Sequence, residues 1–205
     1  MPGHIASIQE SAGGTAITIV DPKTWRSRAL EDLQQLEQRA ARLQVGDPAT
    51  LSFSLSELSD DDRVSELCRR MSQQVKAKTP VIYCFEFEDP SSAAELRNAF
   101  DSRQQKCQIT GEKFRYSRVN KPATTTALYV GSSQSFPSRF SQHLGRIGGA
   151  KTYSMRLAQW ASTVAASIEV SIWTFENGIG QAVLELYEQA LWDLKKPLLG
   201  KRSGK

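Results

Sequence analysis

The sequence predicts a mixed α+β fold, because helical and strand-type patterns alternate along its 205 residues. Leucines at positions 30, 33, 36 and 43 recur at the spacing of a helix with one apolar face. By contrast, Ile168–Phe175 alternates apolar and polar residues with a period of two, as a strand with one buried face does. With 40% hydrophobic and 23% charged residues, the chain has the composition of a globular protein with a sizeable core.

Residues 1–78 are expected to form a mainly helical extension. A strand is expected at Thr15–Val20, followed by a helix at Thr24–Gln44 that a Gly-Asp-Pro sequence ends. A second helix begins at Ser59, whose hydroxyl suits an N-cap, and the three aspartates after it suit the positive end of the helix dipole. We therefore interpret these aspartates as capping residues rather than metal ligands.

Residues 79–205 are expected to form a second domain with three strands. Val81–Phe87 is an apolar and aromatic run with a proline close to each end. Tyr129 lies in the second strand, and Ile168–Phe175 forms the third. Helices are expected at Ser92–Ser102, around Arg139, at Thr152–Ala161 and at Ile179–Leu194, and in the third of these Tyr153, Leu157 and Trp160 share a face that we interpret as core.

The composition disfavours several classes of protein. No apolar run approaches the roughly 20 residues that span a bilayer, and the N-terminus lacks the basic-then-apolar layout of a secretion signal. Three cysteines are an odd number with no CxxC spacing, which argues against a disulfide framework and against a zinc site. The sequence thus predicts a cytoplasmic protein with no membrane partner.

Positive charge is concentrated in one part of the chain. From Lys113 to Ile168 there are eight basic residues and no Asp or Glu, whereas residues 1–112 hold 17 acidic and 13 basic residues. A local positive field of this kind suits a phosphate backbone, although a solvated basic face without a partner explains it equally well. The residues that we expect to contact nucleic acid are Lys113, Arg115, Arg118, Lys121, Arg146 and Lys151.

A short motif in the same segment has the character of a site. An apolar strand ends in Tyr129-Val130-Gly131, and the helix that follows places Arg139 and His143 four residues apart on one face. The guanidinium of Arg139 suits phosphate oxygens, and His143 could donate to the same phosphate or relay a proton. The other histidine, His4, lies near the N-terminus, so His143 is the imidazole that we assign to a site.

Phosphodiester hydrolysis needs a positioned water, positive charge on the developing transition state and help for the leaving oxygen. Glu188 lies at the edge of the apolar face of the final expected helix, where a carboxylate is well placed to bind a metal; Glu185 points further into solvent. Tyr83 and Tyr129 lie in apolar strands, where a buried phenol is often inert. A phenol with a pKa of ~10 becomes useful only beside cations or metal-bound water.

Together these residues resemble the GIY-YIG nuclease family over about residues 80–202. The resemblance rests on Val-Ile-Tyr at Tyr83, the ten-residue step from Tyr129 to Arg139, the further four to His143, and Glu188 followed nine residues later by Pro197. Two features depart from the family pattern. Gly200 stands where many members carry an asparagine, and the tyrosines are 46 residues apart, which implies an insertion at about 89–121 that could serve as a DNA-binding arm.

The resemblance implies a small antiparallel sheet of three strands flanked by helices, with Mg²⁺ or Mn²⁺ on Glu188. It further implies that Tyr83 activates or positions the attacking water, Tyr129 contacts the phosphate, Arg139 stabilises the transition state and His143 assists as a donor or proton relay. We therefore expect a metal-dependent endonuclease of double-stranded DNA, similar to restriction or defence enzymes of this superfamily. A catalytically impaired DNA-binding module is the alternative, and a homodimer would supply the two sites that double-strand cleavage needs.

Overall fold

The computed structural model describes residues 21–121, 125–147 and 152–204, and it divides into two compact units, Met1–Arg42 and Leu43–Lys205. Helix α1 (Pro22–Arg42) is the described part of the first unit. It matches the helix expected at Thr24–Gln44, whereas the strand expected at Thr15–Val20 lies outside the described residues. No helix in the described ranges has the length and apolar character needed to cross a membrane.

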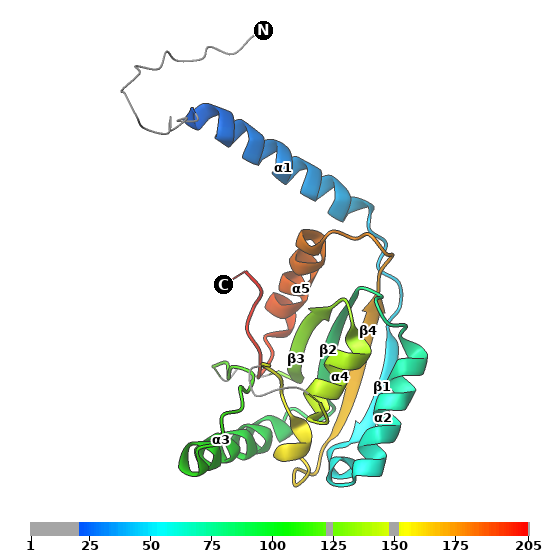
Figure 1. Cartoon of the computed structure of the whole chain (residues 1–205), viewed down its shortest axis with the longest axis vertical. Helices are drawn as coiled ribbons and strands as arrows, with labels where there is room; N and C mark the ends of the chain where they lie inside the picture. The colour runs from blue at the N-terminus through cyan, green and yellow to red at the C-terminus, as the bar shows by residue number, and fades with distance from the viewer. Residues whose placement is uncertain (1–20, 122–124, 148–151, 205) are drawn as a thin grey trace, which may run out of the picture. The chain divides into compact units, whose positions relative to one another are not determined.

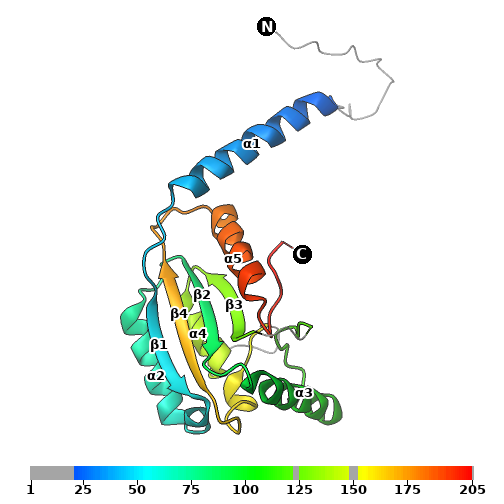
Figure 2. The ribbon, with the colours of Figure 1, turned by 180° about the vertical axis from the view of Figure 1, so that it is seen from behind.

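The second unit is built on a four-stranded antiparallel sheet in the order β1-β4-β2-β3 (Figures 1 and 2). Its strands are β1 (Ala49–Ser54), β2 (Val81–Phe87), β3 (Ala127–Ser133) and β4 (Ser167–Thr174). The mixed α+β class is confirmed, but the expectation of three strands is wrong. Only Leu51 and Phe53 of β1 are buried, and they alternate with Thr50, Ser52 and Ser54 in a short period-two pattern that the prediction missed.

The compact unit begins well before the boundary expected near residue 78. Strand β1 pairs with β4 from Ala49 to Ser54, and helix α2 (Asp61–Gln74) packs against helix α4 (Phe136–Leu144). Residues 49–74 therefore complete the sheet domain rather than a separate extension. The expected N-cap Ser59 is wrong: Asp60 caps α2, and its carboxylate accepts from the backbone N–H groups of Asp62 and Arg63. Asp61 and Asp62 lie in the first turn, as the helix dipole favours.

Helices cover both faces of the sheet. Helices α2 and α4 lie on one face and α5 (Gln181–Lys195) lies on the other, as the front and back views show (Figures 1 and 2). Alternate side chains of β2 follow this division, because Tyr83 and Phe85 pack in the α4 core whereas Ile82 packs with α5. Burial on both faces explains why β2 reads as a nearly continuous apolar run.

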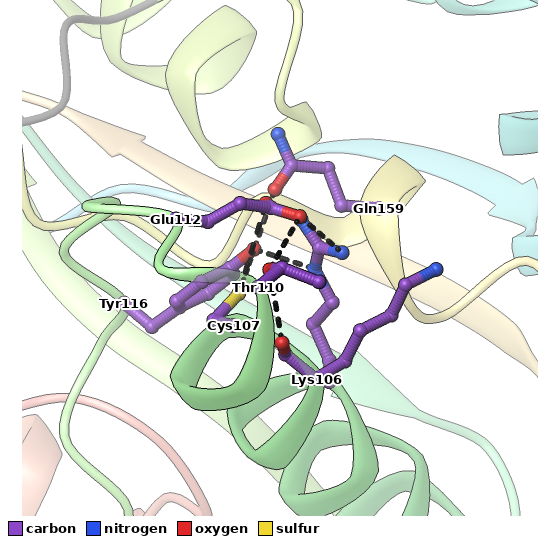
Figure 3. A network of polar contacts seen from close by, with 7 residues as sticks. Lys106, Cys107, Thr110, Glu112, Tyr116 and Gln159 are labelled. Carbon is purple, nitrogen blue, oxygen red and sulfur yellow. Dashed lines mark hydrogen bonds and ion pairs between the residues drawn. The ribbon is translucent and has the colours of Figure 1, made fainter.

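Helix α3 (Ser92–Thr110) extends beyond its expected end at Ser102. A network of polar contacts links it to the segment that follows (Figure 3). The Nε of Arg103 donates to the hydroxyl of Tyr116 over 2.9 Å, and this hydroxyl donates to Gln159. Arg103 also forms an ion pair with Glu112. The network anchors both ends of the Glu112–Tyr116 segment, from which the basic residues at 113 and 115 extend.

The helix expected at Thr152–Ala161 is wrong, since only Leu157–Gln159 forms one turn of 3₁₀-helix. Ser154 instead forms a bridge with Tyr116, and Arg156 adopts a left-handed conformation with φ of 54°, which interrupts an α-helix. Tyr153 is consequently 58% exposed rather than part of the core, although Leu157 and Trp160 are buried as expected.

Candidate active site

Tyr83 of β2 and His143 at the end of α4 meet inside the domain. The Tyr83 hydroxyl lies 3.0 Å from Nε2 of His143, and both side chains are buried. The backbone N–H of Met155 points at the other ring nitrogen, Nδ1, over 3.4 Å. Because a backbone amide can only donate, Nδ1 must be the unprotonated nitrogen, and Nε2–H then donates to Tyr83.

The hydrogen bonds of His143 describe a neutral imidazole. Burial, assisted by the charge of Arg139, holds the pKa of His143 well below its ordinary value. The hydroxyl oxygen of Tyr83 accepts the hydrogen bond from His143, so the hydroxyl proton of Tyr83 can be donated to another group. His143 therefore orients the Tyr83 proton and does not itself carry charge.

Tyr129 and Arg139 complete the cluster from β3 and α4. Nη2 of Arg139 donates to the Tyr129 hydroxyl over 3.4 Å, while Nη1 donates to Gln142 over 2.9 Å and so fixes the guanidinium plane. The rings of Tyr83 and Tyr129 lie nearly parallel, at 11°, with centroids 6.1 Å apart. The Tyr129 and His143 centroids are 4.6 Å apart. The four residues singled out in the sequence thus lie together.

The ionisation of the two phenols is set by this arrangement. Burial is the main cause that raises the pKa of Tyr83, with Tyr129 adding to the rise and Arg139 opposing it. Burial lowers the pKa of Arg139, but the adjacent phenols of Tyr83 and Tyr129 outweigh this effect, so that the pKa is raised overall. Near neutral pH the cluster consequently holds a protonated Tyr83 beside a charged Arg139.

Gly131 makes the close approach of the two tyrosines possible. A Cβ atom at this position would lie 2.7 Å from the Tyr83 hydroxyl oxygen and 2.8 Å from Cε1 of Tyr129. Such distances are far inside van der Waals contact, so any side chain would displace at least one ring. The glycine of the Tyr-Val-Gly motif is therefore required by the site, a role that spacing alone does not reveal.

Glu188 lies on α5 and is only 7% exposed. Its carboxylate accepts hydrogen bonds from the hydroxyls of Ser132, next to Gly131, and Ser203 in the C-terminal segment. Its negative charge contributes to the raised pKa of Tyr83, so the two groups interact electrostatically. No hydrogen bond or ion pair joins Glu188 to Arg139 within the described ranges. Glu185, the weaker candidate for a metal ligand, accepts a hydrogen bond from Nε2 of Gln181 over 2.9 Å.

The C-terminal segment supports both Tyr129 and Glu188. The N–H of Leu199 donates to the carbonyl of Leu128 in β3 over 2.9 Å, and that of Gly200 donates to Arg118 over 2.7 Å. Gly200 has φ of +106°, and a Cβ there would lie 2.9 Å from Cε2 of Tyr129. Where the family resemblance implies an asparagine, this chain therefore has a glycine that packs directly behind the Tyr129 ring.

The donor set around Glu188 consists of oxygen atoms. Its carboxylate and the hydroxyls of Ser132 and Ser203 are ligands of the hard type that Mg²⁺ and Mn²⁺ accept. The described part of the chain contains no cluster of three or more His, Cys, Asp or Glu side chains suited to a metal.

Five of the six expected nucleic-acid contacts are exposed. Lys113, Arg115, Arg118 and Lys121 follow α3, and Arg146 follows α4, whereas Lys151 lies outside the described residues. The Arg115 guanidinium lies 5.3 Å from the centroid of the Tyr153 ring, which combines a cation with an exposed aromatic surface.

The sequence reasoning named Gly131 as the end of a strand, but β3 continues to Ser133 and Gly131 lies within it. Four supporting residues were missed: Ser132, Gln142, Met155 and Ser203. Adjacency could have found two of them, since Ser132 follows Gly131 and Gln142 precedes His143. Comparisons of the chain with models of protein families, with curated proteins and with solved structures found no match.

Proposed function

We propose that this protein is a metal-dependent endonuclease of the GIY-YIG type that hydrolyses DNA phosphodiester bonds. The observation that supports the proposal best is the contact of Tyr83 with His143 and of Tyr129 with Arg139, which brings four polar side chains from three elements together. The donors are the two hydroxyls and the guanidinium, because the N–H of His143 is used by Tyr83. Preorganised donors of this kind stabilise the charge that develops on a phosphate during hydrolysis. DNA is the proposed substrate because an acid-free basic segment borders the same region.

Each residue has a distinct part in the proposed reaction. Arg139 neutralises the non-bridging phosphate oxygens, and Tyr129, which accepts from Arg139, positions the same group. Tyr83 stays protonated near neutral pH, so it orients the attacking water by hydrogen bonding rather than by removing its proton. His143 fixes the direction of the Tyr83 hydroxyl.

Glu188 is the proposed ligand of Mg²⁺ or Mn²⁺. A bound divalent ion would supply positive charge to the phosphate and favour the ionisation of a water. Ser132 and Ser203 hold the carboxylate in one orientation through its two oxygens. Cleavage of both strands requires two such sites, as two copies of the chain would provide.

The test is cleavage of supercoiled plasmid with Mg²⁺, with and without a chelator. Glu188→Ala should reduce the rate by at least about 100-fold, a typical loss for a residue that stabilises the transition state, and should leave DNA binding nearly unchanged. Glu185→Ala is the matched control, because it removes a neighbouring carboxylate of α5 that accepts a hydrogen bond from Gln181 of the same helix. Equal cleavage by the parent and Glu188→Ala would refute the metal role.

A DNA-binding module without catalysis is the second candidate. It is favoured by Gly200, which stands in place of the asparagine of many GIY-YIG nucleases, and by the engagement of both Glu188 oxygens with serines. This candidate predicts salt-sensitive DNA binding with no cleavage under any divalent ion. If the parent protein neither cleaves DNA nor binds it in a salt-sensitive way, both candidate functions are excluded.

A further inference from the structure

Two short segments of the second unit pair with each other through their backbones. Tyr116 forms a parallel bridge with Ser154. The N–H of Ser117 donates to the carbonyl of Ser154 over 3.1 Å, and the N–H of Ser154 donates to the carbonyl of Arg115 over 3.4 Å. Successive side chains of an extended segment point to opposite faces. Arg115 and Tyr153, each one position before the bridged residues, therefore share the face opposite to that of Tyr116 and Ser154.

Arg115 and Tyr153 form a cation–aromatic pair on that face. The guanidinium carbon of Arg115 lies 5.3 Å from the centroid of the Tyr153 ring. Both side chains are exposed, whereas Tyr116 and Ser154 on the other face are buried. A ring that is open to solvent and lies beside a cation offers its π-surface to a planar ligand and the cation to an anion.

The segment that carries Arg115 is anchored on both sides of this residue. On one side, the Tyr116 hydroxyl belongs to the network with Arg103 and Gln159 (Figure 3). On the other, the carbonyl of Arg118 accepts from the N–H of Gly200 over 2.7 Å. An anchored segment loses little conformational entropy when it binds, so the pair is prepared for a ligand.

The same two segments also contact the cluster of the candidate active site. Met155, whose N–H points at Nδ1 of His143, follows Tyr153 by two residues, so their Cα atoms are at most about 7 Å apart. Gly200, which is bonded to Arg118, packs behind the ring of Tyr129. The Arg115–Tyr153 pair thus belongs to the backbone framework that supports the cluster.

The chemistry of the pair fits one nucleotide of a nucleic acid. Every base has a π-face that can stack on an aromatic ring, and a guanidinium binds phosphate oxygens. The surrounding charge is favourable for a polyanion, because the chain has no Asp or Glu from Lys113 to Ile168. Within a duplex, however, both faces of a base are covered by its neighbours. The Tyr153 ring can therefore stack only on a base that has left the helix or was never paired.

We propose that Arg115 and Tyr153 bind an unpaired nucleotide next to the scissile phosphate. The substrate is accordingly DNA with a bulge, a flap or another unpaired base, in preference to a fully paired duplex. This inference rests on the proposed function, since the scissile phosphate is defined by it. Binding measured without a divalent ion separates the two, because stacking needs neither a metal nor cleavage.

Fluorescence anisotropy with two short labelled DNA duplexes in the presence of a chelator tests the subsite. One duplex is fully paired, and the other has one additional unpaired adenine at its centre. The parent protein should bind the bulged duplex at least about five-fold more tightly, as the stacking of one base on an aromatic ring predicts. Tyr153→Leu should abolish this preference, whereas Tyr153→Phe, which keeps the ring, should retain it. Equal binding by the parent, or a preference that survives Tyr153→Leu, overturns the proposal.

A pair of charge variants separates the subsite from general attraction to phosphate. Arg118→Gln should weaken the binding of both duplexes by the same factor and reduce the slope of log affinity against log salt by about one. Arg115→Gln should in addition reduce the preference for the bulge. If the two variants leave the same preference, Arg115 is not part of the subsite. Far-ultraviolet circular dichroism checks that every variant is folded.

Cleavage of the same duplexes with Mg²⁺ then distinguishes this inference from the proposed function. We expect cuts at phosphates next to the unpaired adenine. A parent protein that cleaves both duplexes equally and binds them equally refutes the subsite and leaves the nuclease standing. A preference for the bulge without any cleavage supports the subsite and refutes the nuclease. Tighter binding of an RNA duplex with the same bulge would overturn DNA as the substrate.

Discussion

The hydroxyl of Tyr83 and Nε2 of His143 lie 3.0 Å apart although 60 residues separate them in sequence. The direction of this hydrogen bond follows from a third group, the Met155 amide, which occupies the other ring nitrogen of His143. A neutral imidazole thus donates to a protonated phenol, whose own proton is not used in this hydrogen bond. This ordered donor pair is the feature from which the first two predictions follow.

Tyr83→Phe should destabilise the domain as well as reduce the proposed activity. The substitution keeps the ring contacts but removes the acceptor of His143, which leaves a buried N–H without a partner at a cost of about 1–3 kcal/mol. Chemical denaturation measures this loss, with Tyr153→Phe as the control at an exposed phenol. An unchanged free energy of unfolding would show that the Tyr83–His143 hydrogen bond contributes nothing.

Stability should fall as the pH is lowered below about 6.5, the ordinary pKa of histidine. The folded-state pKa of His143 lies below that of the unfolded chain, so the folded state binds a proton less readily there. Its contribution is thus fully present above the unfolded pKa and is lost as the pH falls toward the folded one. His143→Gln removes the titration, and the difference in free energy of unfolding between parent and variant should shrink between pH 7 and pH 5. A difference that is constant with pH would contradict the neutral, buried imidazole.

Gly131→Ala should disrupt the two tyrosines together. The added methyl would meet both rings closer than 3 Å, and overpacking of this kind typically costs about 1–3 kcal/mol. We expect a lower melting temperature and a large loss of plasmid cleavage. Gly46→Ala is the matched control, since its methyl would meet nothing within 4 Å. Retention of full cleavage by Gly131→Ala would argue against a site between these rings.

Gly200→Ala tests the support of Tyr129 by the C-terminal segment. Two effects combine at Gly200, a left-handed backbone with φ of +106° and contact with the Tyr129 ring. Gly178 has a comparable φ of +99° but open space around it, so Gly178→Ala reports the backbone cost alone, about 1–2 kcal/mol. We expect Gly200→Ala to destabilise more than Gly178→Ala and to alter the near-ultraviolet signal of the tyrosines. Equal effects of the two substitutions would mean that the ring contact is unimportant.

The sequence predicts those helices and strands whose buried residues form a strong apolar pattern. Val81–Phe87 is a strand with the expected bounds, since both of its faces are covered. Strand β1 was missed although Leu51 and Phe53 alternate with polar residues, because the alternation is short and only two of its side chains are buried. The helix expected at Thr152–Ala161 failed because the bridge of Ser154 with Tyr116 is a long-range contact, on which local pattern carries no information.

The candidate site was likewise predicted only in part from the sequence. Motif spacing identified Tyr83, Tyr129, Arg139 and His143, which the structure brings together, because each belongs to a regular element with a recognisable pattern. Backbone contacts such as the Met155 amide are invisible in a sequence, since every residue but proline carries one. The pairing of Ser203 with Glu188 was equally hidden, because it depends on the path of an irregular segment.

The course of the C-terminal segment has a consequence for how the protein is made. Gly200 packs against the Tyr129 ring, Leu199 is hydrogen-bonded to β3, and the Ser203 hydroxyl donates to Glu188. These supporting residues lie more than a hundred positions after Tyr83 in the sequence. During translation, the earlier strands leave the ribosome long before that support is synthesised. A nascent chain that has not yet reached residue 199 therefore lacks the contacts that support Tyr129 and Glu188.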